Sequence, residues 1–147
     1  MSKDELLLYN NIALFSQINL YQQKISFLMY VAVITCPDIA FAVSQLACFL
    51  TNSGPLHQVA ADRTLLYLKR HRDLGLQLGG DDKYLVTSDT SFANNTADHK
   101  SSQNYAMKLF RGLVGWQANK QATVTTSTTE AELMALSQAA REGIYIR

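Results

Sequence analysis

The segment that decides the second half of the fold is Ser127-Thr128-Thr129-Glu130-Ala131-Glu132-Leu133-Met134-Ala135-Leu136. Ser127 followed three residues later by Glu130 matches the S-x-x-E capping box, which satisfies free backbone N–H groups at the start of a helix. One face of the predicted helix combines a carboxylate with small and apolar side chains, namely Glu132, Ala135, Leu136, Ala139 and Gly143. We expect this face to press on a sheet.

Stretches with the period of β-strands precede this helix. Leucines alternate with other residues over 74–78, turn residues occupy 79–82, and an apolar run begins at 84–87, which together predict a hairpin. Two further strands are expected over 105–110 and 113–118, joined by a tight turn. The second half is therefore predicted to be antiparallel strands followed by one helix.

The first half has helical periodicity. Residues 25–34 predict a short helix, and Pro37 and Asp38 mark the start of another that continues to Leu50. A break at 52–55 precedes a further helix, whose predicted buried face is Leu56, Val59, Ala60, Leu66 and Tyr67. The fold class is thus predicted to be α+β, with a helical segment 1–73 packed with a strand-and-helix segment 74–147.

Composition narrows the class of protein. The 147 residues are 48% hydrophobic, with 13 Lys+Arg against 12 Asp+Glu and a net charge of +1, which excludes a mainly disordered chain and disfavours a free-standing polyanion binder. Cys36 and Cys48 are expected to be buried thiols rather than a disulfide. The first residues lack a secretory pattern, so we expect an intracellular protein in the cytoplasm or nucleus, and Pro37 interrupts the apolar run 25–50, so we expect no membrane span.

The candidate chemical groups are two carboxylates and a basic cluster. Asp89 lies where a predicted strand gives way to a polar loop, and it is either a turn residue or a functional acid. Glu132 faces the predicted sheet, so it lies either at the rim in water or opposite a cation. Lys69, Arg70 and Arg72 could contact phosphates, or they could complement the dipole at a helix C-terminus.

Three sets of residues carry a family resemblance. The first set resembles the reverse-transcriptase C-terminal region of copia-type retrotransposon polyproteins. It consists of Tyr30, 37–43, His57, 66–69 and 75–76. The start of the RNase H domain of that family resembles the motifs 88–93, 98–102, 114–116 and 120–121. The segment 127–136 is the most specific match, and the resemblance extends from about residue 21 to the end of the chain.

The resemblance implies a thumb or connection segment followed by an RNase H fold. In that fold four carboxylates hold two magnesium ions, which activate a water and stabilise the leaving oxygen of a phosphodiester. By position, Asp89 matches the first-strand aspartate and Glu132 the first-helix glutamate, so both are the predicted catalytic residues and magnesium ligands. Glu130 matches no catalytic position.

The sequence also departs from the family pattern. Ser91 replaces the usual second Asp of the first-strand motif, and Asn104 replaces an expected Gly. The third and fourth acids of the family would lie beyond Arg147, and the polymerase palm would lie upstream of this chain. We therefore expect a truncated or domesticated remnant that has no cofactor as a monomer and binds Mg²⁺ only if another chain completes the site.

Loss of the fourth strand would expose the edge of residues 84–89. Either residues 74–78 cover this edge within the chain, or two chains pair, and we expect a homo-oligomer with a dimer favoured. One alternative is a residual magnesium-dependent RNase H-type nuclease acting on RNA:DNA hybrids, completed by oligomerisation or by a partner chain. Another is a nucleic-acid-binding module that uses Lys69, Arg70 and Arg72.

Overall fold

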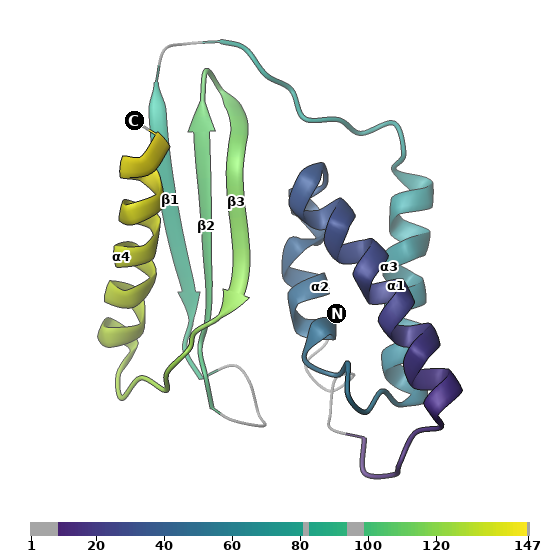
Figure 1. Ribbon diagram of the computed structural model, residues 1–147. Helices are drawn as coiled ribbons and strands as arrows, with labels where there is room; N and C mark the ends of the chain where they lie inside the picture. The colour runs from purple at the N-terminus through teal and green to yellow at the C-terminus, as the bar shows by residue number, and fades with distance from the viewer. Residues whose placement is uncertain (1–8, 81–82, 94–98, 147) are drawn as a thin grey trace. The chain divides into compact units, whose positions relative to one another are not determined.

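The chain forms two compact units, one ending at Gly75 and one beginning at Leu76. The computed structural model describes residues 9–80, 83–93 and 99–146. The first unit is helical, and the second is an antiparallel sheet with one helix (Figure 1). This arrangement confirms the predicted α+β class. Among the described residues, no helix combines the length and the apolar character needed to cross a bilayer.

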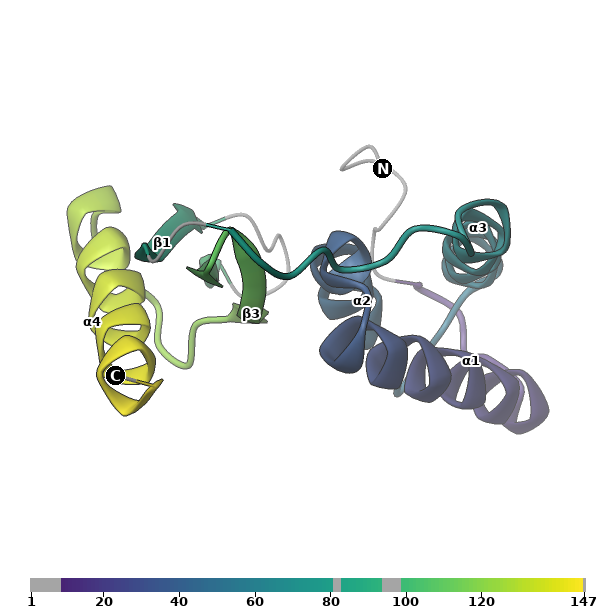
Figure 2. The ribbon, with the colours of Figure 1, turned by 90° about the horizontal axis from the view of Figure 1, so that it is seen from above.

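The first unit is built from α1 (Phe15–Ile34), the short 3-10 helix η2 (Pro37–Ile39), α2 (Ala40–Ala47) and α3 (Pro55–Arg70). Figure 2 shows these helices packed around one another. Their core consists of Tyr21, Ile25, Leu28, Ala32, Ile39, Val43, Leu46, Ala60 and Ala61. The four α1 members recur at i, i+4, i+7 and i+11, which places them on a single helix face.

Helix α1 begins well before the predicted start at residue 25, and Tyr21 is the buried residue that anchors its first half to the core. Helix α2 ends at Ala47 rather than at Leu50. The prediction of two buried thiols is wrong for Cys48, which is exposed with its Sγ 3.6 Å from the Ser44 carbonyl oxygen. Cys36 is half-buried, and neither Cys36 nor Cys48 forms a disulfide.

The predicted buried face of α3 is correct for Ala60, which is buried, and for Tyr67, which packs partly buried against the core, but it is wrong for the other three residues. Leu56, Val59 and Leu66 are exposed, and the buried residues are His57, Ala60, Ala61 and Thr64. His57 can be buried because its Nδ1 accepts a hydrogen bond from the Gly54 N–H at 2.9 Å, and its ring stacks on Phe49 with centroids 4.0 Å apart. The small alanines then allow close contact with the other helices.

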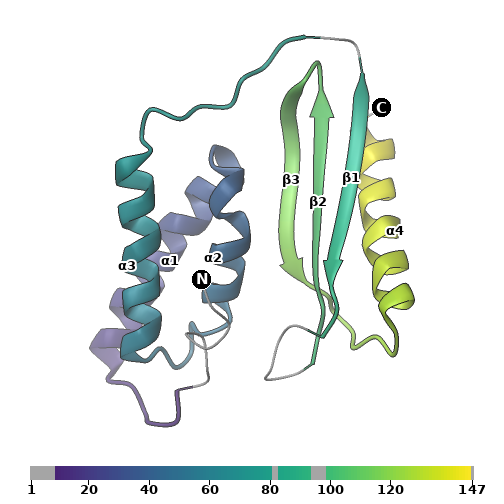
Figure 3. The same ribbon diagram turned by 180° about the vertical axis from the view of Figure 1, so that it is seen from behind.

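The second unit contains β1 (Tyr84–Ser91), β2 (Ser102–Leu109), β3 (Gly112–Lys120) and α4 (Thr128–Ile146). The strands are antiparallel in the order β1-β2-β3, which confirms the three strands predicted after residue 83. Figure 3 shows α4 running beside β1. The residues that α4 buries are Ala131, Ala135, Ala139 and Gly143. Leu136, which was expected to press on the sheet, is exposed.

The predicted strand over residues 74–78 is absent. Residues 74–80 have no regular secondary structure, and residues 81–82 of the predicted turn lie outside the described residues. Leu78 instead packs at the β2–β3 turn, where a Cβ atom added to Gly112 would lie 2.5 Å from its Cδ2. This contact leads the segment away from the outer edge of β1, so the predicted hairpin does not form.

The buried hydroxyl of Tyr21 gives a test of the helical core. It donates a hydrogen bond of 2.8 Å to the Leu46 carbonyl, and burial raises its pKa. We expect Tyr21→Phe to lower the free energy of unfolding by about 1–2 kcal/mol, because the buried carbonyl loses its partner. Tyr30→Phe is the matched control on the same helix, since Tyr30 is 68% exposed. Equal effects in urea titrations of the two variants would contradict this assignment.

Candidate functional site

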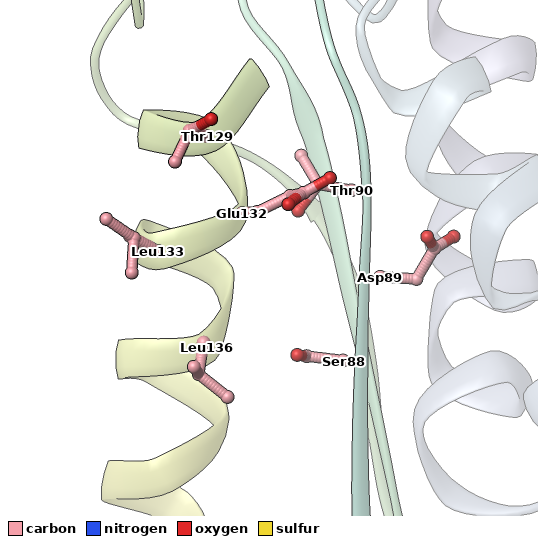
Figure 4. Close-up of a pocket in the computed structure, with 7 residues that line it drawn as sticks. All are labelled: Ser88, Asp89, Thr90, Thr129, Glu132, Leu133 and Leu136. Carbon is pink, nitrogen blue, oxygen red and sulfur yellow. The ribbon is translucent and has the colours of Figure 1, made fainter. Parts of the chain in front are cut away.

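A groove of about 330 Å³ lies between β1 and the first turns of α4. Its lining residues, drawn in Figure 4, are Ser88, Asp89, Thr90, Thr129, Glu132, Leu133 and Leu136. Both acids singled out from the sequence, Asp89 and Glu132, are among them. The groove is therefore the candidate site, and its chemistry depends on how these two carboxylates are positioned.

The start of α4 is fixed by hydrogen bonds from the preceding loop. Ser127 Oγ accepts from the Glu130 N–H at 3.1 Å, which confirms the hydroxyl half of the predicted capping box. The Glu130 carboxylate reaches one residue further back than the motif requires, and accepts from the Thr126 N–H at 2.7 Å and from its hydroxyl at 3.0 Å. The hydrogen bond from the Thr126 backbone is the main reason that the pKa of Glu130 is lowered.

Two polar side chains tie this helix start to the sheet through the Ala131 carbonyl. Gln121, which follows β3, donates to that oxygen from Nε2 at 2.9 Å, and the Thr90 hydroxyl donates to it at 3.4 Å. Sequence reasoning missed both as site-forming residues. The available signal was their position, since both are polar residues at or just beyond the end of a strand.

The two carboxylates lie on opposite sides of β1. Figure 4 shows Glu132 directed from α4 toward Thr90, whereas Asp89 projects from the other side of the strand. Alternation explains this arrangement: Thr90 faces α4, so its neighbour Asp89 faces the opposite side of the sheet. The structure thus brings the acids to the same end of β1 without bringing their carboxylates together. Their catalytic and magnesium-binding roles remain predictions.

The residue paired with Asp89 on β2 is not an acid. This cross-strand neighbour is Asn104, whose Oδ1 is buried and has no hydrogen-bond partner among the described residues. Within residues 9–80, 83–93 and 99–146 there is no group of three His, Cys, Asp or Glu side chains suited to a metal ion. Asp89 therefore borders an amide at the position where the family pattern expects a glycine.

The basic cluster lies in the first unit. Lys69 and Arg70 are in the last turn of α3, where positive charge is favourable for the helix dipole. Arg72 follows the helix, with its Nε 3.8 Å from a carboxylate oxygen of Asp73, and both side chains are exposed. All three cations are accessible, so both the dipole and the phosphate-contact interpretations agree with their positions.

Comparison with known proteins identifies several relatives, although no protein-family model matches the chain. Secreted RxLR effector protein 161 of Plasmopara viticola is 37% identical over 86% of the chain and 90% of its own length. The retrovirus-related Pol polyprotein from transposon TNT 1-94 of Nicotiana tabacum is 36% identical, and that from transposon RE1 of Arabidopsis thaliana is 30% identical, each over 86% of the chain. The chain spans only 10% and 9% of these two polyproteins.

The helix cap predicts a pH dependence. Because the pKa of Glu130 is lowered from 4.5 in the folded state, its carboxylate stabilises the fold above that value, and this stabilisation is lost as the pH falls through the lowered pKa. We expect Glu130→Gln to flatten the decline of the melting temperature in acid. Glu132→Gln is the control on the same helix, because Glu132 accepts neither Thr126 hydrogen bond. Equal acid sensitivity of Glu130→Gln and the unmodified chain would refute this role.

Proposed function

The chain belongs to the family of Secreted RxLR effector protein 161 and is a retrotransposon-derived protein, and we propose that it is a non-catalytic, self-associating segment of the copia-type reverse-transcriptase and RNase H region. The first unit corresponds in this proposal to the thumb or connection, and the second to the start of the RNase H domain. In this proposal a host has domesticated the segment. The segment is retained because it self-associates and not because it hydrolyses RNA.

The observation that carries the non-catalytic part is the divergence of Asp89 and Glu132 across β1 (Figure 4). Two-metal hydrolysis requires carboxylates that converge on ions about 4 Å apart. Here the Glu132 carboxylate reaches from α4 toward Thr90, whereas the Asp89 carboxylate projects from the other side of β1. Ser91 and Asn104, at the two positions where the sequence departs from the family pattern, add no charge. We therefore infer that Asp89 and Glu132 do not form a hydrolytic centre in this chain alone.

This inference predicts the response to magnesium. We expect the purified chain to leave an RNA:DNA hybrid intact in Mg²⁺, and its melting temperature to be the same with and without the ion, because the Asp89 and Glu132 carboxylates do not share an ion. Asp89→Asn and Glu132→Gln should behave like the unmodified chain in both the cleavage and the melting assay. An active RNase H serves as the positive control for cleavage. Magnesium-dependent cleavage that is lost in either variant would instead support the alternative of a residual nuclease completed by oligomerisation.

Binding of nucleic acid through Lys69, Arg70 and Arg72 is tested by salt dependence. A chain of net charge +1 that neutralises few phosphates should bind a hybrid weakly, with a shallow slope of log K against log salt. We expect replacement of all three cations by Ala to change that slope little. A steep slope that the triple variant reduces by about 2–3 would favour the nucleic-acid-binding alternative.

The similarity to a protein named as a secreted effector favours a second candidate, in which the chain acts outside the cell that makes it. The sequence itself contains no Arg-x-Leu-Arg tetrapeptide. We propose an intracellular location as the first candidate. Fractionation of cells that express the tagged full chain separates the two, since export would place it in the medium.

A further inference from the structure

The groove between β1 and α4 is locally acidic. The two segments that form it, 84–93 and 121–140, contain three acids and no Lys or Arg, and the acids are Asp89, Glu130 and Glu132. Glu130 keeps its charge in mild acid, because its hydrogen bonds with Thr126 lower its pKa. Since the whole chain has a net charge of +1, this excess of negative charge is local. Complementarity therefore favours a cationic occupant of the groove.

The Glu132 carboxylate can pair with such an occupant. Within the part of the chain that the structure describes, it has neither a hydrogen-bond nor an ion-pair partner. Figure 4 shows it directed from α4 toward Thr90. Ser88, Thr90 and Thr129 line the same groove, and a hydroxyl oxygen can accept one hydrogen bond while it donates another. These acceptors suit a guanidinium, whose several N–H donors lie in one plane.

The start of α4 offers little to an anion. The Ser127 hydroxyl accepts from the Glu130 N–H, and the Ser127 carbonyl accepts from the Ala131 N–H, each at 3.1 Å. These hydrogen bonds use backbone donors that would otherwise attract a phosphate or a carboxylate. Glu132 would also repel an anion in the groove. The positive end of this helix therefore does not reverse the preference for a cation.

Two leucines give the groove an apolar wall. Leu133 and Leu136 lie one turn apart on α4, and they are 61% and 56% exposed. An arginine combines an aliphatic stem with a charged head, so its stem can cover the leucines while its head meets Glu132. A magnesium ion would leave both leucines uncovered. The volume of about 330 Å³ suits one long side chain better than a large ligand.

We propose that this groove binds an arginine side chain of a protein partner. The guanidinium pairs with Glu132, and the aliphatic stem packs on Leu133 and Leu136. This role goes beyond the proposed function, because it gives the groove a partner of its own and does not depend on self-association. It also agrees with a site that lacks catalysis, since a carboxylate that shares no metal ion can pair with an organic cation.

A chemical-shift titration of the full chain tests the proposal, with a capped alanine pentapeptide that carries a central arginine as the probe. We expect saturable shifts of the methyl resonances of Leu133 and Leu136. The same peptide with citrulline in place of arginine has nearly the same shape without the charge, and it should bind about fivefold more weakly. Absence of saturable shifts at the two leucines, or equal binding of the two peptides, would overturn the proposal.

Variants of the chain assign the charge to Glu132. We expect Glu132→Gln to weaken the arginine peptide about fivefold and to leave the citrulline peptide unchanged, because both changes remove the same ion pair. Leu136→Ala should weaken both peptides alike, since they share the stem. Glu142→Gln is the matched control on α4, because the charge of Glu142 acts on Tyr105 of β2. A folded Glu132→Gln chain that still prefers arginine over citrulline would refute this site.

Discussion

The close contact of α4 with β1 is the constraint on which the second unit depends. It requires small side chains on the helix, because a Cβ atom at Gly143 would lie 3.1 Å from Cγ2 of Val86 and 3.4 Å from the Tyr84 hydroxyl oxygen. With the helix this close, Thr90 reaches the Ala131 carbonyl. Because Thr90 faces the helix, strand alternation directs its neighbour Asp89 to the other side.

The periodicity of the sequence predicted where helices and strands occur better than it predicted which segments pack or pair with one another. The three strands after residue 83, the last helix and its Ser127 cap were all readable from local patterns, since these depend on neighbours in sequence. The hairpin at 74–78 was wrong because alternating leucines show that a segment can form a strand but not which edge it meets. The face of α3 was wrong at Leu56, Val59 and Leu66, because hydrophobicity does not reveal that His57 can be buried when it is satisfied by the Gly54 N–H.

The candidate site was predictable in its location and not in its geometry. Position along the strand and helix placed Asp89 and Glu132 at one end of β1, and both line the groove. Which side of the strand Asp89 occupies depends on the register of β1 against β2 and on the docking of α4, neither of which a single sequence encodes locally. Thr90 and Gln121 were missed for the same reason, because each acts through the Ala131 carbonyl.

The hydrogen bond of 3.1 Å from the Tyr84 hydroxyl to the Gly143 carbonyl joins residues 59 positions apart. During synthesis on the ribosome, the first strand of the sheet emerges long before the helix that covers it. The sheet therefore waits with one apolar face uncovered until the last turn of α4 leaves the exit tunnel. The helical unit precedes the sheet unit in the chain, so its core can form while α4 is still being synthesised.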